Sequence, residues 1–416
     1  MKDIKYLFLL IVMSFLTACS EQKVKIGDEN FEKALIKNKL DDKLDGFITI
    51  DENITSKTDT LNISGSDIIS IEGIEYFSNL KKLNCSDNGI RSLNLSKNSN
   101  LEELNCSSNY LKKLDLSKNN QLKKLDCQEN QTETAGPNFP DTHTPLKFRQ
   151  KEIYNFELNI SNNIKLEELD CSNNFIDSLD LSKNINLVKL NCSDNKLSSI
   201  NLSKNINLVE LYCSGNELSF IDLSKNINLE NLYCLFNNLS SLDVSKNSNL
   251  EGLGCGNNNL SSLDVSKNSN LENLYCAGNN LSSLDVSNNP KLNSLNCSRN
   301  QLTSLNVSRD LEIINCKNNH LTNIDIKDVY NLKYLYCDSN RLKFLDIFQN
   351  YKLENLECDN NVPYYPDLHA FVALNRNKAT VIEPSPDNET IQTCLYWIIG
   401  LLIFLIIAKI IKSISK

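Results

Sequence analysis

The chain has 416 residues and a formal net charge of −9 at pH 7. This charge argues against nucleic acid as a partner, because a face that binds nucleic acid must be basic to neutralise phosphates. The length fits either two or three ordinary domains or one elongated array of repeats.

Residues 1–19 carry the features of an export signal. Lys2 and Lys5 precede an apolar segment, residues 6–15, which is long enough for a signal peptide and too short for a comfortable membrane span. The tetrapeptide LTAC that ends at Cys19 resembles the lipobox of bacterial lipoproteins. That resemblance implies lipidation of Cys19 as the mature N-terminus, and an ordinary cleaved signal is the alternative.

Residues 24–58 are expected to form a helical cap on the repeats that follow. In the segment DENFEKALIKNKL, apolar residues recur at helical spacing as Phe31, Leu35 and Leu40. Asp28 suits the N-cap position, which would make Phe31 the third helical residue.

Residues 41–52, DDKLDGFITIDE, partly resemble a calcium loop of the EF-hand kind. Asp41, Asp45 and Glu52 fall at positions 1, 5 and 12 of such a loop. Lys43 occupies position 3, where an acid or amide is expected, and no clear second helix follows. We therefore expect a turn here, keep Asp41, Asp45 and Glu52 as weak calcium candidates, and expect no cofactor.

Cysteine spacing defines the organisation of residues 59–361. The interval is 21 residues, except for 44 after Cys127 and 19 after Cys297. One unit, residues 101–121, reads LEELNCSSNYLKKLDLSKNNQ and contains two similar half-turns. The thirteen ladder cysteines are Cys85, Cys106, Cys127, Cys171, Cys192, Cys213, Cys234, Cys255, Cys276, Cys297, Cys316, Cys337 and Cys358.

The pattern Leu-x-x-Leu-x-Cys-x-x-Asn-x-Leu resembles the leucine-rich-repeat superfamily, in its bacterial class with a nested 21-residue unit. Residues 68–83, IISIEGIEYFSNLKKL, resemble an internalin-type repeat. A single unit cannot bury its apolar residues, so stacked coils must share one core. We predict a curved solenoid with a parallel sheet on its concave face, coils about 4.8 Å apart, and little helix on its convex side.

The recurring asparagines and cysteines are both predicted to be structural. An inward Asn amide at each bend can donate to and accept from neighbouring coils. The cysteines stand where the repeat family usually has an aliphatic residue, so we expect them to be buried and free. Cysteines that stack in one direction have poor disulfide geometry, and buried thiols are poor nucleophiles.

The interval between Cys127 and Cys171 contains an interruption, residues 128–157, with TAGPNFPDTHTP in its middle. Two structures fit this segment. It is either a loop ejected from the array or a degenerate coil that uses Phe148 and Ile153 as poor core residues. Loops that leave a solenoid often carry recognition, and a tolerated insertion is the alternative.

The residue before each ladder cysteine is expected to point outward on the concave sheet. This column is polar at first and then contains four tyrosines, the first two close enough to stack, with Gly254 as a gap that could admit a ligand group. On the bend after the second tyrosine, an aliphatic and an aromatic residue stand where sister coils have small or polar ones. Aromatic clusters mark binding hot spots, although outward tyrosines also simply suit a sheet surface. The predicted partner-binding residues are Tyr212, Tyr233, Leu235, Phe236, Tyr275 and Tyr336.

The last part of the chain leaves the repeat. Residues 362–382 are expected to cap the array, and residues 383–393 form a polar linker. Residues 394–411 are apolar and, at 1.5 Å per residue, span roughly 27 Å, which is just enough for a transmembrane helix. The basic tail, residues 412–416, places the tail inside and the repeats outside the cytoplasm.

Together these features predict a non-catalytic protein of the bacterial cell envelope. The leucine-rich-repeat resemblance implies binding of a protein or glycan partner through the concave face. The sequence has no visible Ser/His/Asp or Cys/His grouping and no Gly-rich phosphate loop. The alternative is an envelope spacer without a dedicated ligand. The apolar C-terminal segment favours the inner membrane, whereas Ser20 after the lipobox favours the outer one.

Overall fold

The computed structural model describes residues 22–50, 55–130, 156–359 and 361. It divides into two compact units, Met1–Leu197 and Ser198–Lys416.

The predicted membrane signals lie outside the described residues. This holds for the export signal and Cys19, for the C-terminal cap and linker, and for residues 394–411. Within the described ranges, no helix has the length and hydropathy needed to cross a bilayer.

The first unit begins with the predicted helical cap. Helix α2 (Glu29–Lys37) is N-capped by Asp28, whose Oδ1 accepts hydrogen bonds from the amides of Asn30 and Phe31. The other oxygen, Oδ2, accepts from the amides of Ile69 and Ser70, so the same carboxylate ties the helix to the first repeat. Phe31 is fully buried, as the helical spacing predicts.

Two features of the cap differ from the prediction. The helix ends at Lys37, before Leu40, because Lys39 adopts a left-handed conformation (φ 61°). Such a position usually holds glycine, so the sequence gives no stop signal there. An antiparallel pair, β1 (Gln22–Lys25) and β2 (Phe47–Ile50), also joins the two ends of the cap.

The repeats of the first unit stack as predicted, with one three-residue strand per coil in the main sheet. In each main-sheet strand the central Leu is buried and its two neighbours are less buried. A short 3-10 helix, η1 (Ile74–Tyr76), precedes β4. The strands pair in parallel in the order β3 (Thr60–Asn62), β4 (Lys82–Asn84), β5 (Glu103–Asn105), β7 (Lys124–Asp126), β9 (Glu168–Asp170) and β10 (Lys189–Asn191).

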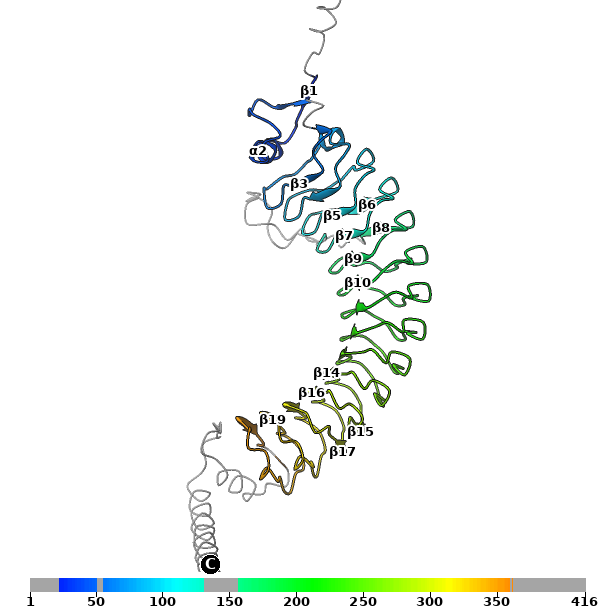
Figure 1. Ribbon diagram of the computed structural model, residues 1–416, viewed down its shortest axis with the longest axis vertical. Coiled ribbons are helices and arrows are strands. Elements are labelled where there is room, and N and C mark those ends of the chain that lie inside the picture. The colour runs from blue at the N-terminus through cyan, green and yellow to red at the C-terminus, as the bar shows by residue number, and fades with distance from the viewer. Residues whose placement is uncertain (1–21, 51–54, 131–155, 360, 362–416) are drawn as a thin grey trace, which may run out of the picture. The chain divides into compact units, whose positions relative to one another are not determined.

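The strands on either side of the interruption pair directly, which contradicts the degenerate-coil alternative, and residues 131–155 lie outside the described residues. Strand β7 pairs directly with β9, and the amide of Cys127 donates to Asp170 across 2.8 Å. In the second half-turn, β6 (Lys113–Asp115) pairs in parallel with β8 (Glu157–Asn159). Figure 1 shows β6 and β8 on the other side of the coils from β5 and β7. Phe148 and Ile153 lie outside the described residues.

The second unit continues the same arrangement. Most strands bury one central residue, and a second small parallel sheet forms from β15 (Ser283–Asp285) and β17 (Ser304–Asn306) in the second half-turns (Figure 1). The main strands pair in the order β11 (Glu210–Tyr212), β12 (Asn231–Tyr233), β13 (Gly252–Gly254), β14 (Asn273–Tyr275), β16 (Ser294–Asn296), β18 (Ile313–Asn315), β19 (Tyr334–Tyr336) and β20 (Asn355–Glu357).

The ladder cysteines form part of the core, as predicted. All thirteen are buried and free, and none takes part in a disulfide. They lie beside the buried leucines of the same coil, for example Leu229 and Leu232 beside Cys234. A free thiol behaves there as a small hydrophobe.

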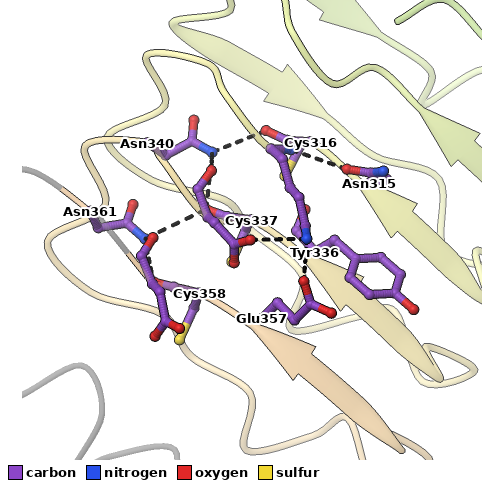
Figure 2. Close-up of polar contacts among 11 residues, drawn as sticks. Asn315, Cys316, Tyr336, Cys337, Asn340, Glu357, Cys358 and Asn361 are labelled. Atoms are coloured by element: carbon purple, nitrogen blue, oxygen red, sulfur yellow. Dashed lines mark hydrogen bonds and ion pairs between the residues drawn. The ribbon is translucent and has the colours of Figure 1, made fainter. Parts of the chain in front are cut away.

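The asparagines of the first register pair as predicted. Asn340 donates from Nδ2 to the carbonyls of Cys316 and Cys337, each at 3.0 Å (Figure 2). Its Oδ1 accepts from the amide of Leu321. In the second register the amide donates without accepting. Asn247, for example, donates to the carbonyls of Leu223 and Asn226, while its Oδ1 has no donor among the described residues.

Candidate functional site

The tyrosine column on the sheet of the second unit contains a stacked pair. Tyr212 and Tyr233 occupy the same register position on β11 and β12. Their ring centroids are 5.4 Å apart and the ring planes differ by only 9°, which confirms that they stack. Tyr275 lies two strands beyond Tyr233, with Gly254 between them in the register.

Strand β13 presents glycine at successive outward positions, and the adjacent tyrosines cover it. A methyl group on Gly254 would lie 2.6 Å from Cδ1 of Tyr233, and one on Gly252 would lie 3.1 Å from its hydroxyl. The Tyr233 ring therefore lies along β13. From the other side, Cε1 of Tyr275 comes within 2.6 Å of the same position on Gly256.

The expected ligand-sized gap at Gly254 is therefore absent. The Tyr233 ring fills it, together with Leu235, whose Cδ1 would come 2.9 Å from a methyl group on Gly254. All three glycines are buried. The missing side chains let the rings of Tyr233 and Tyr275 pack directly onto the backbone of these glycines.

The bend after β12 exposes an aromatic ring at an energetic cost. Phe236 is 62% exposed and has φ 51°, a left-handed conformation that is unusual for a bulky residue. The equivalent position is also left-handed in the sister coils, where it holds Gly215 and Asn257 but also Glu129 and Arg299. The conformation therefore belongs to the repeat, and the exposed apolar ring is what distinguishes Phe236 from the equivalent residues.

Tyr336 lies apart from this aromatic surface. It is on β19, three strands beyond Tyr275. Its ring lies 5.1 Å from Nζ of Lys317, which also pairs with Asp338 at 2.9 Å and with Glu357. Figure 2 shows Tyr336 and Glu357 together on the adjacent strands β19 and β20. The six predicted partner-binding residues therefore divide into one group of five and Tyr336 alone.

A second aromatic bend lies in the first unit. Phe175 has φ 42° and lines a hollow of about 690 Å³ with Tyr110 and Glu129 among others. Nζ of Lys196 lies 4.8 Å from the centroid of the Phe175 ring. This ring is thus engaged within the protein, unlike that of Phe236.

Of the weak calcium candidates, Asp45 has another partner. Oδ2 of Asp45 forms an ion pair with Lys23 at 3.2 Å, and Oε1 of Glu32 accepts from the amides of Asp45 and Gly46. Burial is the main cause that raises the pKa of Asp41. Glu52 lies outside the described residues. These contacts fix the turn that we expected, and no cluster of three potential metal ligands occurs in the described parts of the chain.

The ladder thiols are poor candidates for chemistry. Burial raises the pKa of Cys234 to about 12, and it raises that of Cys255 well above the usual value, with a further contribution from neighbouring thiols. A nucleophilic or metal-binding cysteine needs the thiolate, which this environment disfavours.

Sequence reasoning identified the tyrosines and Gly254 but missed the consequence of Gly252 and Gly256. The alternation Gly-x-Gly-x-Gly across one strand was the available signal, because residues two apart share a face. The left-handed conformation of Phe236 gave a weaker signal, since sister coils carry glycine and asparagine at that position but also serine, glutamate and arginine.

No protein-family model and no curated protein matches the chain. Among solved structures, it is similar to the functional domain of InlJ from Listeria monocytogenes, which includes a cysteine ladder (30% identity, 82% of this chain, 77% of that chain, TM-score 0.65). A leucine-rich-repeat protein of Leptospira interrogans (20% identity, 80% and 97%, TM-score 0.61) and the internalin InlF of Listeria monocytogenes (17%, 86% and 96%, TM-score 0.61) share the fold.

Proposed function

The chain belongs to the internalin-like bacterial leucine-rich-repeat proteins with a buried cysteine ladder, and from that premise we propose that it is a surface protein that binds a protein or glycan partner. The internalin-like fold is typically non-catalytic. The binding face is the aromatic surface formed by Tyr212, Tyr233, Leu235, Phe236 and Tyr275.

The exposed aromatic ring of Phe236 is the observation that supports this proposal most. Its side chain is 62% exposed at a left-handed position where the sister coils carry glycine, polar or charged residues. A large apolar ring that stays in solvent contributes little to the stability of the array. A spacer without a ligand would need only the stacked core, to which this ring contributes little.

The anchoring of the protein is part of the same proposal. Lipidation at Cys19 and a membrane helix over residues 394–411 would hold the repeats outside the cytoplasm. Tyr336 is a peripheral contact in this arrangement, because three strands separate it from the others.

Capture of envelope components on the immobilised full-length chain tests the function. We expect a partner to be retained by the wild type and lost by the variant Tyr233→Ala/Phe236→Ala. Phe220→Ala is the matched control, because Phe220 is equally exposed (63%) but belongs to the second half-turn. Equal capture by all three proteins, or none by the wild type, would contradict the proposal.

A further inference from the structure

Charge is sorted between the two halves of the coils that carry the aromatic surface. Between residues 209 and 280, every cation lies in the second half-turn, as Lys225, Lys246 and Lys267. Those lysines share their half-turn with a matching column of aspartates that begins at Asp222. On the sheet side the same stretch carries glutamates and no lysine or arginine. The aromatic surface is therefore acidic, whereas the opposite half-turns are close to neutral.

Three of these glutamates form a row of like charges. Glu230, Glu251 and Glu272 occupy the position just before each strand on successive coils. The amide of Glu251 donates to the carbonyl of Glu230 and that of Glu272 to the carbonyl of Glu251, both at 2.8 Å. All three side chains are exposed, and no cation among the described residues forms an ion pair with them.

The same column is neutralised elsewhere in the protein. Lys123 pairs with Glu102 at 2.7 Å in the first unit, and Lys333 pairs with Glu312 at 2.8 Å in the second. The repeat thus accommodates alternating charge at this position. Like charges on directly adjacent strands are destabilising. The three successive glutamates therefore lower the stability of the free protein relative to an alternation of glutamate and lysine.

Two tyrosine hydroxyls lie near the strand starts beside this row, whereas the Tyr275 ring leans the other way, onto Gly256. The hydroxyl of Tyr212 lies 3.5 Å from Oε2 of a further glutamate, Glu210, the first residue of its strand. The hydroxyl of Tyr233 lies over Gly252, the residue that follows Glu251. Carboxylates and tyrosine side chains therefore lie within a few residues of one another along these strands.

We propose that the partner is a basic protein segment, whose lysine or arginine side chains contact the row Glu230–Glu251–Glu272 and lie over the tyrosine rings. The inference rests on the proposed function and specifies its ligand. Cations are attracted both to carboxylates and to aromatic faces, and such complementarity also steers association. A neutral glycan suits the rings but leaves the glutamates unneutralised.

Binding of fluorescent oligo-arginine to the full-length chain tests the proposal, with oligo-glutamate and a neutral chito-oligosaccharide as comparison probes. The variant E230Q/E251Q/E272Q is expected to weaken oligo-arginine binding about tenfold, since three exposed pairs contribute roughly 0.5 kcal/mol each. The matched control is D222N/D243N/D264N, which removes three charges from the same coils on the other half-turn. Asparagine should keep the hydrogen bond that each aspartate accepts from the backbone amide two residues later. Asn201, at the equivalent position of a neighbouring coil, accepts such a bond from the amide of Ser203. The control should stay within twofold of wild type.

The other outcomes separate this inference from the proposed function. If both triple variants weaken oligo-arginine binding equally, the effect is one of net charge and the inference is overturned. The inference is also overturned if the wild type does not bind oligo-arginine but binds the oligosaccharide through Tyr233 and Phe236. That second result would leave the proposed function intact. The glutamine variant should also unfold at higher urea concentration than wild type, because it removes like-charge repulsion.

Discussion

Substitution of Asn237 by alanine tests whether the ladder asparagines hold adjacent coils together. Asn237 is buried and makes four hydrogen bonds. Its Nδ2 donates to the carbonyls of Cys213 (2.9 Å), Cys234 (3.3 Å) and Leu235 (3.2 Å), and its Oδ1 accepts from the amide of Leu218 (3.0 Å).

The expected cost follows from what each partner retains. The carbonyls of Cys213 and Cys234 keep a bond from another ladder asparagine, and that of Leu235 keeps the amide of Gly215. The amide of Leu218 loses its acceptor. An orphaned buried donor costs about 1–3 kcal/mol, and a hydrogen bond contributes about 0.5–1.5 kcal/mol. Because the three carbonyls keep a second donor, we place their losses at the low end and expect a total loss of roughly 3–4 kcal/mol.

Urea unfolding followed by circular dichroism measures this loss, and amide exchange at Leu218 localises it, since repeat arrays can open in parts. Asn238→Ala is the matched control, because its side chain is exposed and makes no hydrogen bond among the described residues. The reasoning is refuted if the two variants unfold at the same urea concentration.

Four further expectations follow from the contacts described above. Burial first, and Asp170 in addition, raise the pKa of Asp126, so the folded state loses stability as pH rises from the unfolded pKa through the folded one. Asp126→Asn should therefore raise the urea midpoint at pH 7 but not near about pH 3, and an equal effect at both would contradict this. Cys85, Cys192 and Cys276 have pKa values raised to about 12 by burial, so about one thiol in 10⁴ is ionised at pH 8, and Ellman's reagent should label them only in denaturant. Replacing residues 131–155 by a short Gly-Ser linker should leave the urea midpoint unchanged because β7 and β9 already pair, and a lost transition would disprove it. Gly254→Ala should shift the Tyr233 ring, seen in the near-ultraviolet dichroism, and weaken partner capture while far-ultraviolet dichroism stays constant.

The repeat made much of the fold predictable. Because each coil contacts its neighbours in a fixed register, a position in one 21-residue unit identifies its neighbours in the next. This is why the stacking of Tyr212 on Tyr233 and the burial of the cysteines followed from spacing alone. The asparagine contacts of the first register followed for the same reason.

The remaining features depend on interactions that the period does not encode. The direction in which Tyr233 leans is set by the absence of side chains on a different strand. The length of the interruption fits either an extra coil or an insertion, and only the direct pairing of β7 with β9 distinguishes the two. The end of α2 depends on a left-handed lysine, a residue type that gives no such signal.

The thirteen free thiols have a consequence for the way in which the protein must mature. Export, as the N-terminal segment predicts, would bring the unfolded chain into an environment where exposed thiols can be oxidised. The described fold contains thirteen free cysteines, so oxidation of the unfolded chain can only produce non-native disulfides. The thiols are protected only once folding has buried them. A stack of similar coils can nucleate at any coil and propagate to its neighbours. Each newly added coil withdraws one more cysteine from the reach of oxidants, so the speed of propagation along the array sets the yield of intact protein.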